Sequence, residues 1–166
     1  MEILRRIERH GVTGALQAVK GTVEDPGASS ALRGEALRVL GSLQEEIDPL
    51  VMHALREGAV HLKRGALVGL LRSGSIEGIV YAGAALLEDL QSSSPSDRIF
   101  AAQVLRGAAI PSFYRQAIQL LNDPEPSVQE AAVEAAAAMA HPALWPLVVD
   151  ALRDRQLTAV ASEALI

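Results

Sequence analysis

The stretch LLNDPEPSVQEAAVEAAAAM, residues 120–139, decides the fold of this 166-residue chain. An apolar segment ends at the turn signal Asn122-Asp123-Pro124, and a long alanine-rich segment follows it. Alanine is the strongest helix former, and its small side chain lets two helices approach closely. The stretch therefore predicts two helices that are joined by a short turn and packed against each other.

The second half of this stretch recurs along the chain, as a small residue followed by an apolar one four positions later. The copies are LRGEALRVL from Leu32, LKRGALVGL from Leu62, DRIFAAQVL from Asp97, VQEAAVEAA from Val128 and LTAVASEAL from Leu157. Their small residues are Ala36, Ala66, Ala101, Ala132 and Ala161, which are 30, 35, 31 and 29 residues apart. A period near thirty predicts a solenoid of helix pairs with these alanines at buried contacts.

A second phrase alternates with the first. IDPLVMHALRE, residues 47–57, matches LWPLVVDALRD, residues 144–154, and looser copies cover residues 79–89 and 113–123. Two helix types therefore make one repeat. We expect an all-α protein, a right-handed α-solenoid of stacked antiparallel helix pairs with about five repeats and roughly 10–11 helices. We expect residues 1–166 to form a single domain of this kind, cut from a larger protein.

Local signals place the ends of several helices. Gly11, Gly58 and Gly74 are expected to end helices, and Asp48 before Pro49 is expected to start one. Ser127 and the glutamate three residues later have the spacing of a capping box.

Composition and motifs argue against enzyme activity and against metal or cofactor binding. The net charge of −5 gives no general attraction to nucleic acid or anionic lipid, cysteine is absent, and no apolar run is long enough to span a membrane. The histidines, His10, His53, His61 and His141, lack the spacing of a metal site. Glu45, Glu46 and Asp48 offer either a cation site or, as we favour, the capping of a helix. We expect no enzyme activity, no catalytic or metal-binding residues and no cofactor.

The turn at Asp123-Pro124 and the alanine helix after it resemble the HEAT repeat, and the similarity covers most of the chain. In that family the first helix of each pair lines the outer, convex side and the second lines the inner, concave side. The resemblance therefore implies that the five alanine helices are inner ones, and it implies a role in holding other macromolecules.

Residues 112–165 are also similar to the HEAT segment of bacterial multidomain membrane proteins related to ATP/ADP translocases. This second resemblance implies an alternative function, a cytoplasmic regulatory domain of a nucleotide-transporter-like protein that contacts nucleotide phosphates. It also implies a cytoplasmic location, tethered to the inner membrane through the parent protein.

Basic residues gather on the first inner helices and give a candidate concave binding surface. Its members are Arg33, Arg38, Lys63, Arg64, Arg98 and Arg106. Arg33, Lys63 and Arg98 hold equivalent positions, where a structural ion pair with an acid near the preceding turn is the alternative, with Asp25 and Glu57 available. We therefore expect glutamate at Arg38, Arg64 and Arg106 to impair binding and to spare folding.

Two further expectations concern partners. Trp145 is either an anchor for a partner on the outer side or a filler of the alanine-rich core. The last segment, LTAVASEALI, leaves an apolar stripe uncovered, which predicts weak self-association. The function expected from the residues is a noncatalytic scaffold that binds a protein or another domain of its own chain, with no nucleic acid and no membrane insertion.

Overall fold

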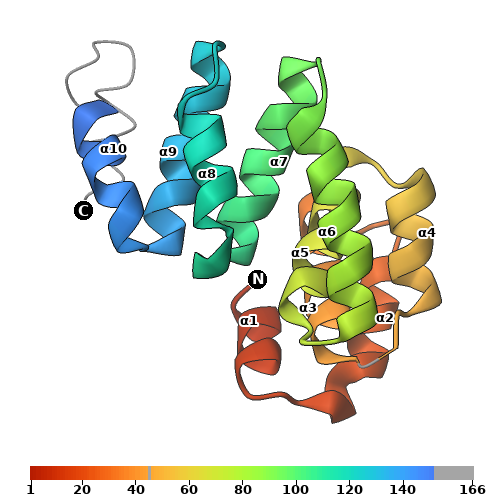
Figure 1. Ribbon diagram of the computed structural model, residues 1–166. Coiled ribbons are helices and arrows are strands. Elements are labelled where there is room, and N and C mark those ends of the chain that lie inside the picture. The colour runs from red at the N-terminus through yellow and green to blue at the C-terminus, as the bar shows by residue number, and fades with distance from the viewer. Residues whose placement is uncertain (45, 152–166) are drawn as a thin grey trace. The chain divides into compact units, whose positions relative to one another are not determined.

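All regular structure in the part of the chain that the computed structural model describes, residues 1–44 and 46–151, is helical (Figure 1). The α-helices are α1 (Glu2–Arg9), α2 (Leu16–Glu24), α3 (Ser30–Leu43), α4 (Pro49–Glu57), α5 (Val60–Arg72), α6 (Ile76–Gln91), α7 (Pro95–Ala108), α8 (Tyr114–Leu121), α9 (Pro126–Met139) and α10 (Trp145–Ala151). Short 3-10 turns precede three of them, at Thr13–Ala15, Pro111–Phe113 and Pro142–Leu144. The all-α class and the α-solenoid expected from the sequence are confirmed.

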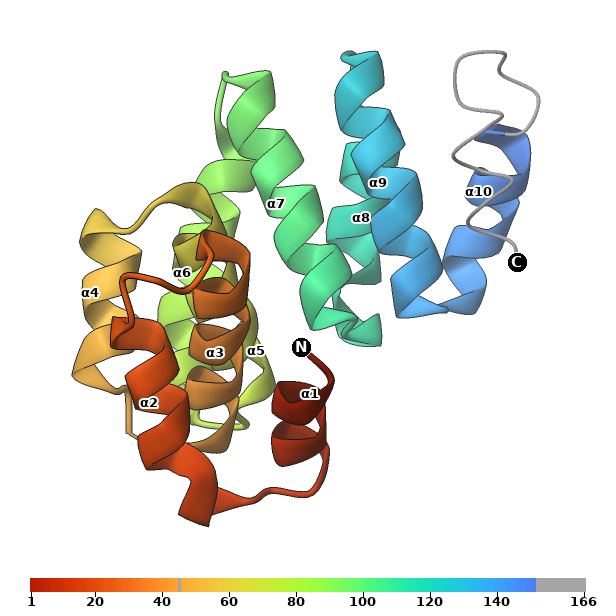
Figure 2. The same cartoon turned by 180° about the vertical axis from the view of Figure 1, so that it is seen from behind.

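The chain forms two compact units, residues 1–84 and 85–166, and the long helix α6 runs through the boundary. In the first unit α3 and α5 lie side by side, α2 packs on α3 and α4 packs on α5. Helix α1 packs on the side of α3 away from α2 (Figure 2). In the second unit α7 and α9 lie side by side, while α8 and α10 both contact α9. That the two units act as a single domain stays a prediction.

The repeated alanines lie at the centre of this packing. Ala36, Ala66, Ala101 and Ala132 have no exposed surface, and the residues four positions later are buried as well. Ala161 lies outside the described residues. The period read from the sequence therefore marks the buried side of each inner helix, as expected.

Glycines bring α3 and α5 closer together than alanine would allow. A Cβ atom on Gly65 would lie 1.9 Å from the carbonyl oxygen of Gly34, and one on Gly69 would lie 2.5 Å from the carbonyl oxygen of Arg38. Both separations are below van der Waals contact, so the two backbones touch directly. The sequence predicted that alanine would let neighbouring helices approach closely. Because glycine has no Cβ, α3 and α5 approach each other more closely than alanine would allow.

Most of the expected helix ends are present. The Asp48 carboxylate accepts a hydrogen bond from the backbone N–H of Leu50 at 2.9 Å and caps α4. Gly11 and Gly74 adopt positive φ values of 58° and 73°, the left-handed conformation expected after a helix. The capping box at Ser127 was a wrong prediction, because α9 already begins at Pro126 and its N-cap is Glu125.

The segment expected to associate with itself, the end of the chain after Ala151, lies outside the described residues. Within the described part, no helix combines the length and the apolar character needed to cross a membrane.

Candidate functional site

An ion-pair cluster centred on Arg38 lies in the first unit on the side of α3 against which α1 packs, here called the inner side. Arg38 lies in the middle of α3 and is only 9% exposed. Its Nε and Nη2 donate to the two carboxylate oxygens of Glu35 at 3.0 and 2.7 Å, and its Nη1 donates to Glu8 of α1. The hydrogen bonds from Arg38 outweigh the opposing effect of burial and hold the pKa of Glu35 below its usual value. A buried cation is thus held between two carboxylates.

The same cluster ties α1 to two inner helices. The second oxygen of Glu8 lies 3.5 Å from Nε of Arg72, the last residue of α5. Helix α1 also supplies a cation to α3, because Nε of Arg5 lies 3.8 Å from Oε1 of Glu35. Leu4, one turn before Glu8, is 7% exposed. Helix α1 therefore binds the inner side through one apolar residue and through charges of both signs.

Several features show that α1 is held by few contacts. It has eight residues, and helices this short are marginal in isolation. Leu4 is the one residue of α1 that is buried, and the other large apolar residue beside it, Ile3, is 74% exposed. Oε1 of Glu8 is buried and accepts no hydrogen bond, which leaves this carboxylate incompletely satisfied. The stability of α1 depends on its docking against α3.

Arg98 has a structural role in the second unit. Its Nε and Nη2 donate to the two oxygens of Asp123 at 2.7 and 2.9 Å, and its Nη1 donates to the carbonyl oxygens of Ser92 and Ser93. Asp123 lies in the turn before α9 and is 8% exposed. The expected ion pair exists, but the acid belongs to the following turn rather than to the preceding one. Arg98 thereby links the start of α7 to the next inner helix.

The other candidate residues have different environments. Nε of Arg33 donates to the carbonyl oxygen of Val23 at 2.7 Å, whereas the carboxylate of Asp25, its expected partner, accepts from the N–H of Gly27. Lys63 is half-buried, and Arg64 contacts the imidazole of His61 at 3.2 Å.

Arg106 and Arg38, both proposed for binding, differ in their exposure to solvent. Nη1 of Arg106 lies 2.7 Å from Glu134 of α9, and both side chains are well exposed. Arg38 is buried, so glutamate there would place three carboxylates together. The expectation that Arg38→Glu spares folding is therefore corrected. Binding by the remaining candidates stays a prediction.

Trp145, the candidate outer anchor, is the first residue of α10 and is half-buried. Just before it, the imidazole of His141 stacks on the ring of Tyr114, with centroids 4.3 Å apart, and accepts a hydrogen bond from the N–H of Ala143. His141 therefore has a packing role at the start of the 3-10 turn.

In residues 1–44 and 46–151, no group of three or more His, Cys, Asp or Glu side chains is arranged so that it could hold a metal ion. A hollow of about 470 Å³ lies at the turn between α6 and α7, lined by Glu88, Asp89, Gln91, Ser92, Ser93 and Asp97. Its lining is polar and acidic, unlike the largely apolar walls that bind small molecules.

Sequence reasoning missed Glu8 as the partner of Arg38. Glu35 and Arg38 are three residues apart, a spacing at which oppositely charged side chains meet on a helix. Glu8 is thirty residues away from Arg38, and its pairing depends on where α1 docks. The spacing in the sequence could have predicted the pair Glu35–Arg38, whereas nothing in the sequence indicates the pair Glu8–Arg38.

Comparison with known proteins agrees with the packing of helix pairs. The family model for HEAT repeats matches residues 83–166, just over half of the chain. No curated protein and no solved structure matches the chain. The translocase-like relationship is thus not shown, while the match to the repeat model and the helical architecture agree in the second unit. The chain belongs to the HEAT-repeat family.

Proposed function

We propose that the chain is a noncatalytic scaffold whose inner side, around Arg38 and Arg72, binds a helical segment of a protein partner or of another domain. One observation carries this proposal: Glu8 of α1 already occupies these two guanidinium groups. HEAT repeats stack into extended surfaces that commonly hold protein partners. The alternative role beside a nucleotide transporter stays a prediction from resemblance.

The contacts of α1 define the chemistry that the inner side accepts. Leu4 supplies a buried apolar group, and Glu8, four residues later on the same side of the helix, supplies the carboxylate. A partner helix with an apolar residue and a glutamate at this spacing would present the same two groups. Because Glu8 is incompletely hydrogen-bonded, a better-placed carboxylate would compete with it.

A peptide-binding experiment tests the proposal. The probe is a fluorescent synthetic peptide of residues 1–10, added to the full chain with Leu4→Ala and Glu8→Gln, two changes that weaken the attachment of its own α1. We expect binding that weakens as salt rises, because charges at the rim of the site are screened. The matched probe, the same peptide with Glu8→Gln, should bind more weakly because it lacks the carboxylate.

Two arginine variants locate the binding. Arg72 has a 40% exposed side chain, so Arg72→Gln should fold and should weaken peptide binding. Arg56, an exposed residue in the last turn of α4, serves as the matched control, and Arg56→Gln should bind like its parent. Equal binding of both peptides, or equal effects of the two arginine changes, would overturn the proposal.

A further inference from the structure

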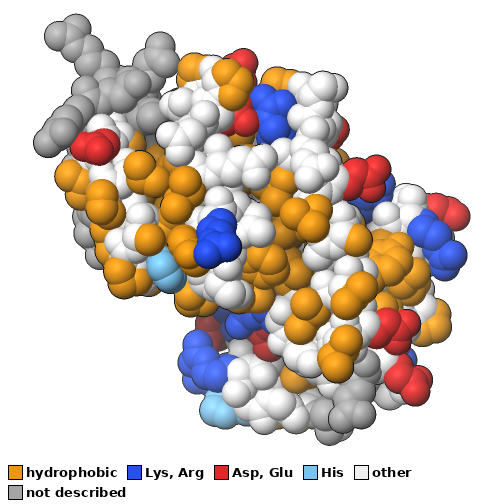
Figure 3. Space-filling model, viewed as in Figure 1, with side chains coloured by type: hydrophobic (Ala, Val, Ile, Leu, Met, Phe, Trp, Pro, Cys, Tyr) orange, Lys and Arg blue, Asp and Glu red, His pale blue; other side chains and the backbone are white. Residues whose placement is uncertain are grey.

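Helix α6 exposes far more apolar surface than a helix of a folded repeat needs to. Five of the ten large hydrophobic residues exposed in the described part of the chain lie on it. Their exposed fractions are 83% for Ile76, 65% for Val80, 48% for Leu87 and 40% each for Ile79 and Tyr81. Figure 3 shows orange side chains along this helix. Contiguous apolar surface of this kind marks interaction sites.

The outer helices α2, α4 and α8 present polar or small residues to solvent, and α10 exposes one large apolar residue, Val149. The exposed residues include Gln17, Ala18 and Gly21 on α2, His53, Arg56 and Glu57 on α4, and Arg115 and Gln119 on α8. The apolar surface is therefore specific to α6 among these helices and is not a general property of the repeat.

Three exposed residues of α6 form a line with the half-buried Gly83. Ile76, Val80, Gly83 and Leu87 are spaced by four, three and four residues, the spacing with which one helix packs along another. Ala82 and Leu86, which lie away from this line, are buried against the rest of the protein. A helix that is apolar on both sides is normally covered on both sides, and α6 is covered on one.

Gly83 fits the same interpretation. It lies inside α6, where glycine costs about 0.5–1 kcal/mol relative to alanine. A Cβ atom at Gly83 would meet no atom within 4 Å, so nothing in the described chain requires glycine there. A second helix lying along the line would approach α6 most closely at this residue.

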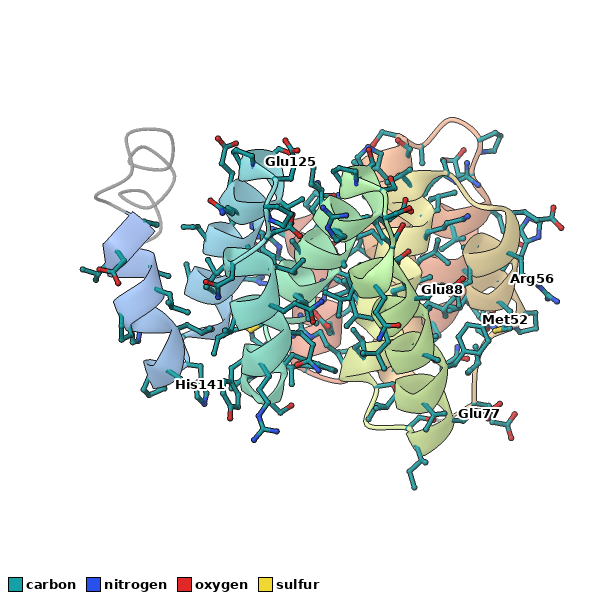
Figure 4. The ribbon with its side chains drawn as sticks, turned by 45° about the horizontal axis from the view of Figure 1, so that its top comes forward. Met52, Arg56, Glu77, Glu88, Glu125 and His141 are labelled. Atoms are coloured by element: carbon teal, nitrogen blue, oxygen red, sulfur yellow. The ribbon has the colours of Figure 1, made fainter. Side chains whose placement is uncertain are left out.

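Charge identifies the kind of partner. Helix α6 carries Glu77, Glu88 and Asp89 and no basic residue. Glu77 and Glu88 are exposed, near opposite ends of the helix, as Figure 4 shows. A second copy of α6 packed antiparallel would place Glu77 of one chain near Glu88 of the other, and anionic lipid would be repelled. Basic groups beside an apolar stripe would complement this surface.

We propose that the exposed line of α6 is a docking surface for an amphipathic helix of a protein partner, with lysine or arginine beside its apolar stripe. The partner's apolar residues pack on Ile76, Val80 and Leu87, close to Gly83. Its basic residues pair with Glu77 and Glu88. This surface is independent of the inner side around Arg38, so the two proposals stand or fall separately.

The experiment uses two synthetic amphipathic helices of equal length, one of leucine and lysine and one of leucine and glutamate. We expect the full chain to bind the first peptide and not the second. The double variant Ile76→Ser with Val80→Ser should bind the leucine–lysine peptide about tenfold more weakly or worse, since it loses two apolar contacts. Both residues are exposed, so an unchanged thermal melt should confirm that the variant folds.

Matched variants separate specific docking from general attraction to an acidic chain. Val60 is 59% exposed on α5, and Val60→Ser should leave binding unchanged. Glu77→Gln with Glu88→Gln should reduce the dependence of binding on salt. The proposal is overturned if no peptide binds, if the glutamate peptide binds equally well, or if the serine variant binds like its parent. Dimerisation in sedimentation that the serine variant abolishes would assign the surface to a second copy instead.

Discussion

Arg98 and Asp123 form a two-point ion pair that joins the start of α7 to the turn before α9, with N···O distances of 2.7 and 2.9 Å. Asp123 Oδ1 also accepts the backbone N–H of Glu125 at 3.0 Å. We expect Asp123→Ala to lower the free energy of unfolding by about 1–3 kcal/mol, because it leaves these donors unpaired. Urea unfolding measures the change.

The matched control is Glu125→Gln, which removes an equal charge from an exposed residue of the same turn. Its stability should stay within about 0.5 kcal/mol of the parent. Equal losses in the two variants would show that Asp123 acts through the net charge of the turn and not through its contacts.

The same pair predicts how stability depends on pH. The hydrogen bond from Arg98 holds the pKa of Asp123 below its usual value, and burial opposes it. A carboxylate with a lowered folded-state pKa stabilises the fold above its unfolded pKa of about 3.9, and this contribution is lost as pH falls through the folded-state pKa.

Urea unfolding between neutral pH and pH 3 should therefore show a fall in stability at the acid end. Asp123→Asn should reduce that fall, since the titrating group is gone. An acid-dependent loss as large in Asp123→Asn as in the parent would show that other carboxylates account for it.

The contact between α3 and α5 predicts an unusually damaging alanine. Gly65→Ala would place Cβ 1.9 Å from the carbonyl oxygen of Gly34 and force the helices apart, at a cost near the upper end of about 1–3 kcal/mol. Gly21, inside α2, has open space around the same position, so Gly21→Ala should stabilise by about 0.5–1 kcal/mol. Thermal melts in which both variants shift in the same direction would contradict the direct backbone contact.

Two helices end on an alanine where glycine is the usual residue. Ala109 after α7 and Ala140 after α9 have φ values of 51° and 50°, a conformation that strains any residue with a Cβ. We expect Ala109→Gly and Ala140→Gly each to stabilise by about 0.5–1 kcal/mol, the relief of strain exceeding the entropy of glycine in the unfolded chain. Ala138→Gly, inside α9, should destabilise by a similar amount.

Differential scanning calorimetry of the three variants measures these effects. A lower melting temperature for both capping variants would mean that the left-handed alanines are not strained in solution.

The sequence predicted the features that depend on neighbouring residues. The buried alanines, the Asp48 cap and the left-handed Gly11 and Gly74 follow from helical spacing and from turn chemistry. Ser127 was misjudged as the N-cap because Pro126, which also favours the first turn of a helix, starts α9 two residues earlier than that cap requires.

The sequence did not predict the features that depend on how helices stack. The acid that binds Arg98 follows it by 25 residues, and the glutamate that binds Arg38 precedes it by 30. A repeat period places equivalent helices side by side, but which side chains meet depends on helix register and on where α1 docks. The sequence therefore identified the basic residues of the candidate site, but it did not predict which acidic residues they contact.

The most direct test of the account asks whether α1 can be displaced from the inner side by a second helix. The chain has no cysteine, so Ile3→Cys, at a 74% exposed residue, gives one site for a fluorescent or spin label on α1. We predict a label of restricted mobility that becomes mobile as unlabelled peptide of residues 1–10 is added, and a smaller change with the more weakly binding Glu8→Gln peptide. A label that stays restricted while the peptide binds would contradict the account, as would one that is already mobile without it.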